Sequence, residues 1–299
     1  MKTTGWKIRL AAAVLALGAA GAAQAATWTL GSGTGYWTNS ANWSTAAVPG
    51  PADDVLFTNG TATVTLTADV TINSLNITNT FTGTLTFSTG VSAGLYVAND
   101  LYVKTNATLQ CTYSSTNGNG TGRVITVGGN AVVNGTITAD SLGFPDAQGP
   151  GAGANNAGGA SHGGRGSRNV APYGSLTQPT SLGSGGNSSA GGGAVMLVVS
   201  NSLTLNGSIS ARAAAGHDAG SGGSIWLIAS NFAGVGSLNA DGGNWSGTGS
   251  GAGGRIAVAV TNSTFSGSVT AAGGMKPADG SIASPARCGG RATCRRQET

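Results

Sequence analysis

One five-residue phrase occurs four times in this 299-residue chain: a glycine, three residues with an apolar one in the middle, and an alanine. The copies are Gly-Thr-Ile-Thr-Ala at 135–139, Gly-Ser-Ile-Ser-Ala at 207–211, Gly-Ser-Leu-Asn-Ala at 236–240 and Gly-Ser-Val-Thr-Ala at 267–271. A short unit that recurs in this way buries its apolar side chains by stacking on its neighbours. The phrase therefore predicts a solenoid.

Apolar pairs separated by one residue indicate a second strand in each turn. They are Val55/Phe57, Leu75/Ile77, Leu95/Val97, Ile125/Val127, Val195/Leu197, Ile225/Leu227 and Ile256/Val258. An asparagine soon follows each pair: Asn59, Asn79, Asn99, Asn130, Asn201, Asn231 and Asn262. We expect the pairs to stack in register and the asparagines to bond to their counterparts on neighbouring turns.

The composition favours short strands. The chain has 53 glycines and only 8% charged residues, and apolar residues alternate in short bursts instead of following a helical period. Three strands per turn predict an all-β, right-handed parallel β-helix over residues 55–274. A flat β-sandwich is the alternative architecture, but it does not require the same bend residue at each recurrence.

Glycine-rich runs follow the third strand of each turn. They cover residues 140–194, 212–224, 241–255 and 272 onward, and the first is a long insertion expected to be partly disordered and cut early by protease. All these loops should leave from one corner. On a solenoid that corner forms a lateral face, where binding surfaces are common.

The two ends differ from the body. Residues 1–25 combine basic residues, an apolar run and an Ala-Gln-Ala cleavage site, which predicts a secretory signal peptide. No later run is long enough for a transmembrane segment, so the mature product is expected to be soluble outside the inner membrane. Residues 26–54 are rich in tryptophan (Trp28, Trp37 and Trp43) and predict an N-terminal cap, with a sugar-stacking platform as the alternative.

Charge argues against a nucleic-acid partner. The formal net charge is +4, yet residues 26–274 contain six Lys or Arg against eight Asp, and the six are scattered. Of the three cysteines, Cys111 is expected to pack in the core, whereas Cys288 and Cys294 could pair with each other after export. Ligand spacing for a zinc site is missing.

Two stretches resemble a known family. The opening Gly-Tyr-Trp-Thr-Asn-Ser-Ala-Asn-Trp at 35–43 and the Gly-Gly-Ala-Ser-His-Gly-Gly-Arg-Gly run at 158–166 resemble secreted bacterial surface proteins with autotransporter-type, adhesin-like β-strand repeats. The resemblance implies an exported stalk or adhesin and carries no catalytic residues. The regular pattern is lost after Ile282, so residues 275–299 are expected to be an irregular basic tail, either native or from a truncated or frame-altered end. With that tail offering no cover, we expect self-association through the last turn, residues 256–271.

Enzymatic motifs have weak support. Gly-Ala-Ser-His-Gly at 159–163 fits a nucleophile elbow around Ser161, and residues 249–254 fit G-x-G-x-x-G, but neither has the required strand and helix around it. A polysaccharide lyase is the enzymatic alternative, since such enzymes share the β-helix. The body offers only isolated aspartates apart from Asp53 and Asp54, so no catalytic residue, metal or cofactor is predicted.

The loops hold the most distinctive side chains, and we expect a ligand site there. The candidates are His162, Arg165, Tyr173, His217, Asp218, Asp241 and Trp245, with Arg168 beside them. The simpler interpretation is that these are solvated polar residues of glycine loops. The sequence thus predicts a secreted or cell-surface structural and adhesive protein whose loop face binds polysaccharides or other glycans.

Overall fold

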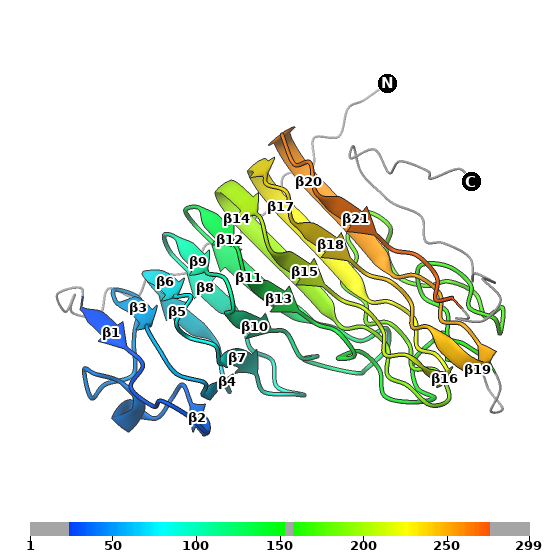
Figure 1. Ribbon diagram of the computed structural model, residues 1–299, viewed down its shortest axis with the longest axis horizontal. Helices are drawn as coiled ribbons and strands as arrows, with labels where there is room; N and C mark the ends of the chain where they lie inside the picture. The colour runs from blue at the N-terminus through cyan, green and yellow to red at the C-terminus, as the bar shows by residue number, and fades with distance from the viewer. Residues whose placement is uncertain (1–23, 153–157, 276–299) are drawn as a thin grey trace.

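The computed structural model describes residues 24–152 and 158–275, and this part of the chain is all-β. Its one described helical element is a turn of 3-10 helix, η1 (Ser40–Asn42). The strands form two large sheets and one two-stranded sheet, and neighbouring strands within them are parallel. They stack along the long axis of the molecule, from β1 at one end to β20 and β21 at the other (Figure 1). No described helix is long and apolar enough to cross a membrane.

The larger sheet has eleven strands in two rows. The first row contains β5 (Val70–Ile72), β8 (Leu95–Val97) and β11 (Arg123–Val127). The second contains β1 (Ala25–Thr27), β3 (Asp54–Phe57), β6 (Ser74–Ile77), β9 (Leu101–Val103) and β12 (Ala131–Val133). Three long strands, β14 (Ala194–Leu205), β17 (Ser224–Ala233) and β20 (Arg255–Ser263), run through both rows.

The second large sheet has eight strands. They are β2 (Thr34–Tyr36), β4 (Thr63–Leu66), β7 (Thr84–Phe87), β10 (Thr108–Gln110), β13 (Thr136–Thr138), β15 (Ser208–Ser210), β18 (Ser237–Asn239) and β21 (Ser268–Thr270). The four copies of the repeated phrase form its last four strands and stack in register. Their stacking confirms that the phrase is the repeating structural unit. The two-stranded sheet, β16 (Gly216–Asp218) with β19 (Trp245–Gly249), lies among the loops.

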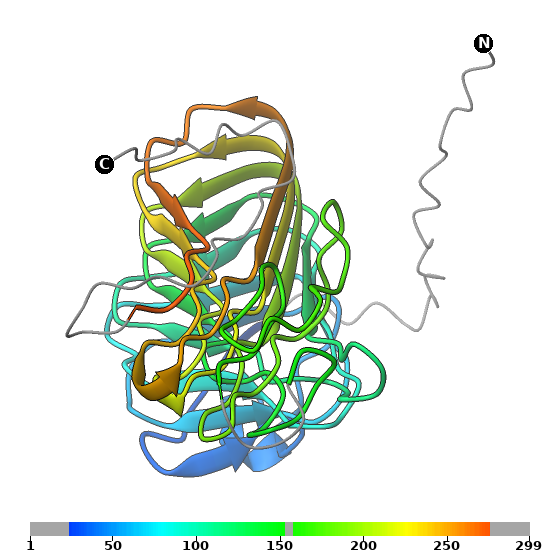
Figure 2. The same ribbon diagram turned by 90° about the vertical axis from the view of Figure 1, so that its right-hand side faces the viewer.

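Alternating side chains explain why the two large sheets enclose one core. The middle residue of most short strands is apolar and points inward, as Leu85, Leu109 and Ile137 do with no exposed surface. The apolar side chains form one continuous cluster from Ala26 to Ile256. Viewed from the end, the sheets curve around this interior and the green glycine-rich segments gather at one side (Figure 2).

The predicted ladder of apolar pairs is correct at four of its six steps. Among the early steps, Val55 aligns with Leu75 and Leu95 aligns with Ile125, as predicted. Ile225 aligns with Val195 and with Ile256, as expected. The pair at 75/77, however, aligns with Leu101 and Val103 in the second row, whereas the pair at 95/97 belongs to the first row. The apolar pattern does not distinguish the two rows, because strands of both rows show the same alternation.

A second correction concerns the register beside the long insertion. Ile125 aligns with Leu197 rather than with Val195, so this step of the predicted ladder is shifted by one pair. The residue aligned with Val195 is Arg123, a buried cation that apolar pattern alone does not select.

The asparagines form short hydrogen-bonded pairs instead of a single series. Asn262 donates from Nδ2 to Oδ1 of Asn231 at 3.1 Å, as predicted. Asn99 donates to Asn73 at 2.6 Å, and Asn206 to Asn134 at 3.0 Å, so residues outside the predicted series are also used. Such side-chain bonds join successive turns at their bends.

The three tryptophans of residues 26–54 are buried against the start of the core. Trp28, Trp37 and Trp43 are 2–3% exposed, and all three rings pack within about 6 Å of Phe57. The indole N–H of Trp43 donates to the carbonyl of Trp37 at 2.8 Å. Because these ring faces are covered, they are not a platform on which a sugar could stack.

The described residues test only part of the predictions about the cysteines and the signal peptide. Cys111 is fully buried, as expected, and burial raises the pKa of its thiol to about 12. Cys288, Cys294 and nearly all of the 275–299 tail lie outside the described residues. Of the predicted signal peptide, only Gln24 and Ala25 are described: the Gln24 carbonyl accepts a hydrogen bond from the Asp54 N–H, and Ala25 begins β1.

Candidate functional site

The glycine-rich loops leave from one corner of the fold, as the sequence predicts. Each loop starts after the alanine that ends the repeated phrase, and the returning chain closes the exit with a backbone hydrogen bond. Gly193 N–H donates to the Ala139 carbonyl at 2.7 Å. The equivalent bonds join Gly223 to Ala211 at 2.8 Å and Gly254 to Ala240 at 2.7 Å.

The loops pack on one another through glycine backbone. Gly192 N–H donates to the Ser221 carbonyl at 3.0 Å, and Gly222 N–H to the Ala252 carbonyl at 2.9 Å, so each loop is bonded to the next. A Cβ on Gly251 would come within 1.8 Å of the Gly220 carbonyl oxygen, which explains why glycine fills these layers. The described parts of the 140–194 insertion are largely hydrogen-bonded and packed, although the stretch 174–178 is exposed.

A polar groove lies where the loops begin. Its walls come from positions just after the repeated phrase in successive turns, which places Asp140, Arg212 and Asp241 in one column. Arg212 forms a two-pronged ion pair with Asp140, with Nη2 to Oδ2 at 2.8 Å and Nε to Oδ2 at 3.0 Å. The groove has a volume of about 400 Å³, and Asn239 and Asn244 add amide groups to its lining.

Two of the predicted site residues, His162 and Tyr173, lie together in the interior of the loop layer. Their ring centroids are 4.7 Å apart, and His162 has no exposed surface. The His162 Nδ1 atom lies 2.7 Å from the Gly222 carbonyl oxygen, and Nε2 has no partner. Burial lowers the pKa of His162 to about 4, because the charged imidazolium loses its hydration.

Tyr173 and Arg255 join the insertion to the last described turn. The Tyr173 hydroxyl donates to the Leu182 carbonyl at 2.6 Å and shares a hydrogen bond with Ser184 Oγ at 2.7 Å. Arg255, at the start of β20, donates from Nε to the Tyr173 carbonyl at 2.9 Å. Burial raises the pKa of the Tyr173 phenol and lowers that of the Arg255 guanidinium. The group therefore stabilises the loops and offers no exposed site.

The other predicted residues are spread over the loop face. Arg165 is exposed and donates to the Asn169 backbone carbonyl and side-chain Oδ1. His217 is exposed beside the buried Asp218, with Nδ1 3.5 Å from Oδ2, in strand β16. Trp245 begins the adjacent strand β19 and is half-buried. Arg168 is half-buried as well.

Of the seven predicted site residues, Asp241 is the one that lines the polar groove. Its Oδ1 accepts a hydrogen bond from the Ala272 N–H at 2.6 Å, and its Oδ2 accepts one from Thr270 Oγ1 at 3.2 Å. The seven residues thus occupy several places on and beneath the loop face. Their common location in the loops did not bring them together at one site.

Several isolated aspartates join one turn to the next. The carboxylates of Asp69, Asp100 and Asp140 accept backbone N–H groups from Gly94, Asn130 and Arg212, each at 2.7 Å. Asp54 accepts side-chain hydrogen bonds from the following turn in the same way. In the described chain, three or more His, Cys, Asp or Glu side chains do not gather in a group that could hold a metal ion.

The two enzyme-like motifs have structural roles. Ser161 is fully buried and its Oγ accepts a hydrogen bond from the Gly166 N–H at 2.9 Å, which is incompatible with an exposed nucleophile on an elbow. Residues 249–254 lead from β19 back to β20, and no helix follows them. Both patterns arise from the high glycine content.

Arg123 is a structural residue that sequence reasoning missed. Its side chain is 1% exposed, lies over the Phe87 ring, and donates to the carbonyls of Ser88, Val91 and Thr112, among others. A buried guanidinium surrounded by carbonyl oxygens anchors the segments around residues 88–93 and 112–113 to β11. Arg123 is the first residue of β11, just before its alternating apolar residues, and Arg255 has the same position in β20. This shared position is the signal that could have identified Arg123.

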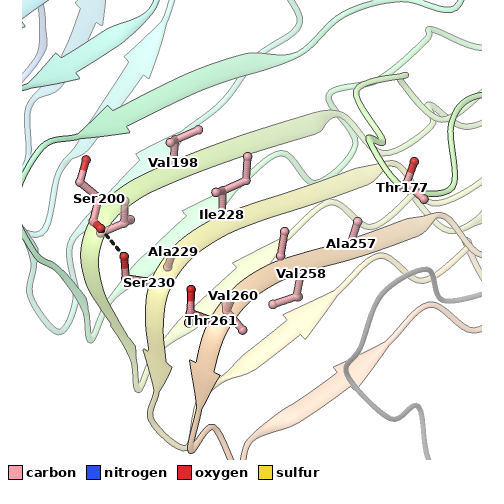
Figure 3. Close-up of a pocket in the computed structure, with 12 residues that line it drawn as sticks. Thr177, Val198, Ser200, Ile228, Ala229, Ser230, Ala257, Val258, Val260 and Thr261 are labelled. Atoms are coloured by element: carbon pink, nitrogen blue, oxygen red, sulfur yellow. Dashed lines mark hydrogen bonds between the residues drawn. The ribbon is translucent and has the colours of Figure 1, made fainter. Parts of the chain in front are cut away.

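A second hollow lies along the bent strands β14, β17 and β20 (Figure 3). Its volume is about 630 Å³, and the aligned residues Val198, Ile228 and Ala259 line it, with Thr177 of the insertion at one end. Its lining contains aliphatic and hydroxyl side chains but no charged group. The polar groove therefore offers the richer set of hydrogen-bonding groups.

Comparison of the chain with protein-family models, with curated proteins and with solved structures gives no significant match. Its function is therefore inferred from its own geometry.

Proposed function

We propose that this chain is an exported, right-handed parallel β-helix that serves as an extracellular or cell-surface structural and adhesive module and binds glycans through its loop face. The all-β stack of parallel strands supports the β-helix, since equivalent strands of successive repeats align residue by residue. In this proposal the buried Trp28, Trp37 and Trp43 form a cap over the first turn, which would otherwise expose apolar side chains and strand edges.

The polar groove is the observation that carries the binding proposal. It presents a guanidinium, carboxylates and amides at equivalent corners of successive turns: Arg212, Asp140, Asp241, Asn239 and Asn244. Planar groups of this kind form paired hydrogen bonds with adjacent hydroxyls, which are the repeating feature of a glycan. Because the same corner recurs at each turn, an extended chain of sugars could contact several turns at once.

Catalysis on the same polymer is less well supported. A lyase needs carboxylates that hold a cation together with a Lys or Arg base, and a hydrolase needs a free carboxyl pair. Asp140 and Asp241 each accept a backbone N–H from the following turn, and Asp140 is also paired with Arg212. These bonds hold both carboxylates in place, where they can still accept hydrogen bonds from sugar hydroxyls but do not form a free acid–base pair, so we favour binding without turnover.

A glycan array tests the proposal. The purified chain is applied to immobilised pectin, alginate, cellulose and chitin fragments beside two variants, Arg212→Ala and Lys104→Ala. Arg212 is half-exposed in the groove, whereas Lys104 lies over the Tyr102 ring at another corner and controls for loss of one positive charge. We expect binding to at least one polymer that falls in Arg212→Ala and persists in Lys104→Ala.

Two results would overturn the proposal. One is an array without signal for the unmodified chain. The other is equal binding by the two variants, which would place recognition outside the groove. Release of unsaturated sugars from any polymer, followed by ultraviolet absorbance, would favour the lyase alternative.

A further inference from the structure

The outward surface of the eight-stranded sheet carries a regular array of hydroxyl groups. In most of these strands an apolar residue faces the core and the residues on either side of it face outward. The first outward column is Thr34, Thr63, Thr84, Thr108, Thr136, Ser208, Ser237 and Ser268. The second is Tyr36, Thr65, Thr86, Gln110, Thr138, Ser210, Asn239 and Thr270. We call these two columns the threonine face.

The composition of the threonine face is unusually uniform. Two columns of eight give 16 positions, and three of them (Tyr36, Gln110 and Asn239) are neither Thr nor Ser, which leaves 13 hydroxyl-bearing positions of these two types. None of the 16 is charged. Outward positions in the first row of the other sheet are different, because Val124, Met196 and Trp226 align there. Exposure on a strand does not by itself account for the array.

The spacing of the array is fixed by the backbone. Seven successive strand pairings, from β2 to β21, proceed without a register shift. Adjacent strands are about 4.8 Å apart and alternate residues of a strand about 6.7 Å apart, so seven steps extend about 34 Å. These strands are stacked side by side along the molecule in Figure 1. By contrast, the pairing of β14 with β17 shifts register between Val199 and Ser202.

Hydrogen bonds join neighbouring hydroxyls at two places in the columns. Ser208 Oγ bonds to Thr136 Oγ1 at 3.3 Å, and Ser210 Oγ to Thr138 Oγ1 at 3.2 Å. Threonine is also restricted in rotation about its Cα–Cβ bond, so the methyl and hydroxyl groups are held in set directions. Most of the columns are partly accessible, and the most shielded members are Thr86 and Ser210, at 8% and 6%.

We propose that the threonine face binds ice. A rigid array with a fixed repeat along two directions can make the same contact at every step only with a partner that is itself periodic. Water held between columns of methyl and hydroxyl groups at a set spacing can join a crystal of water, and the absence of charge avoids strongly hydrated ions at the contact. Each contact is weak, but all form together because the scaffold is already ordered.

A crystalline polysaccharide is the other periodic partner to consider. Pyranose rings are recognised mainly by aromatic rings that stack against their apolar faces. The threonine face has one aromatic residue, Tyr36, and it lies on the terminal strand β2. The observations therefore favour ice. The threonine face shares one residue, Asn239, with the polar groove, and its other 15 positions lie outside the groove. Its proposed function therefore does not depend on the glycan proposal.

The test measures incorporation of the fluorescently labelled full chain into slowly growing ice, together with the difference between its melting and freezing temperatures. Thr108→Tyr and Thr84→Lys disrupt the first column near its middle, at side chains that make no hydrogen bond within the described structure. Thr204→Tyr is the matched control, because Thr204 also faces outward but belongs to β14 in the other sheet. Circular dichroism and thermal unfolding establish that each variant is folded.

We expect the unmodified chain and Thr204→Tyr to enter the ice and to separate the melting and freezing temperatures, and both column variants to lose most of that activity while remaining folded. Exclusion of the unmodified chain from ice would overturn the proposal. So would equal activity of the control and the column variants, and so would binding to crystalline cellulose or chitin without binding to ice. If a column variant unfolds, the result for the other one decides.

Discussion

Gly223 lies against the carbonyl oxygen of Gly193 so closely that a Cβ at position 223 would come within 1.8 Å of it. The loop layers are thus spaced for glycine backbone. We expect Gly223→Ala to lower the free energy of unfolding by about 1–3 kcal/mol, because the layers must separate to admit a methyl group. Denaturant unfolding measures this, with Gly31→Ala as the control, since a Cβ there meets nothing within 4 Å. Equal stability of the two variants would contradict the packing described.

Leu227 and Ile228 are sequence neighbours on opposite faces of β17. Leu227 has no exposed surface, whereas Ile228 faces the outer hollow. Leu227→Asp would bury an unpaired carboxylate, and we expect it to cost more than about 4 kcal/mol and prevent folding. Ile228→Asp should fold. Circular dichroism of the two variants checks this, and a folded Leu227→Asp would mean that the strand register is wrong.

Arg123 and Arg212 provide a comparison between a buried and an exposed arginine. Arg123→Leu would leave the Val91 carbonyl and the buried Thr112 carbonyl without their donor, and we expect a loss of about 3 kcal/mol or more. Arg212→Leu removes an exposed ion pair and should cost no more than about 1 kcal/mol. Thermal unfolding of both variants shows which substitution costs more stability. A larger effect at Arg212 would be contrary to expectation.

His162 should make stability depend on pH. Burial beside Tyr173 and Arg255 lowers the pKa of His162 in the folded state to about 4 from its ordinary value of 6.5. Between these two pH values the unfolded chain binds the proton more readily than the folded chain does. The contribution of His162 is complete above pH 6.5 and is lost as the pH falls to about 4. We expect His162→Gln to reduce the slope of unfolding free energy against pH in this range, as measured by denaturant unfolding at a series of pH values. An unaltered slope in His162→Gln would show that another group is responsible.

Self-association through the last turn stays a prediction, and the structure identifies a residue with which to test it. Val269 is 36% exposed in β21, whose one described strand neighbour is β18. A lysine on a strand edge opposes pairing with a second chain. Light scattering over a range of concentrations should therefore show less association for Val269→Lys than for the unmodified chain. Val235→Lys, at a site 71% exposed elsewhere, serves as the control and should associate normally.

Repetition made the eight-stranded sheet predictable. The phrase around Ile137 recurs with the same residue types at the same places, and in a parallel stack such copies align directly, as Ile137 and Ile209 do. The exit corner of the loops followed from the same regularity. The first and second rows were harder to separate, because Leu95 and Leu101 lie in similar alternating strands and periodicity alone does not say which row each joins.

The candidate site was less predictable, because burial in the loops does not follow a period. His162 and Arg165 are close in sequence, yet one is fully buried and the other exposed. Arg255 lies far from His162 in the sequence and donates to the backbone carbonyls of His162 and Tyr173. Every residue has a backbone carbonyl, so the identity of the accepting residues does not reveal these contacts. The polar groove depends on the alignment of Asp140 with Arg212, and that alignment needed the strand register first.

The hydrogen bond from Gly193 to Ala139 has its counterpart after every later copy of the phrase up to Ala240, with nearly the same length, although the chain between the two partners ranges from a dozen residues to more than fifty. The stacked strands therefore accept loops of very different lengths at this corner. Lengthening a closed loop adds only a small entropic cost. Insertions and deletions at these exits can accumulate without any change to the interior. Proteins that share these stacked strands could therefore differ in the surface that their loops form through changes in loop length alone.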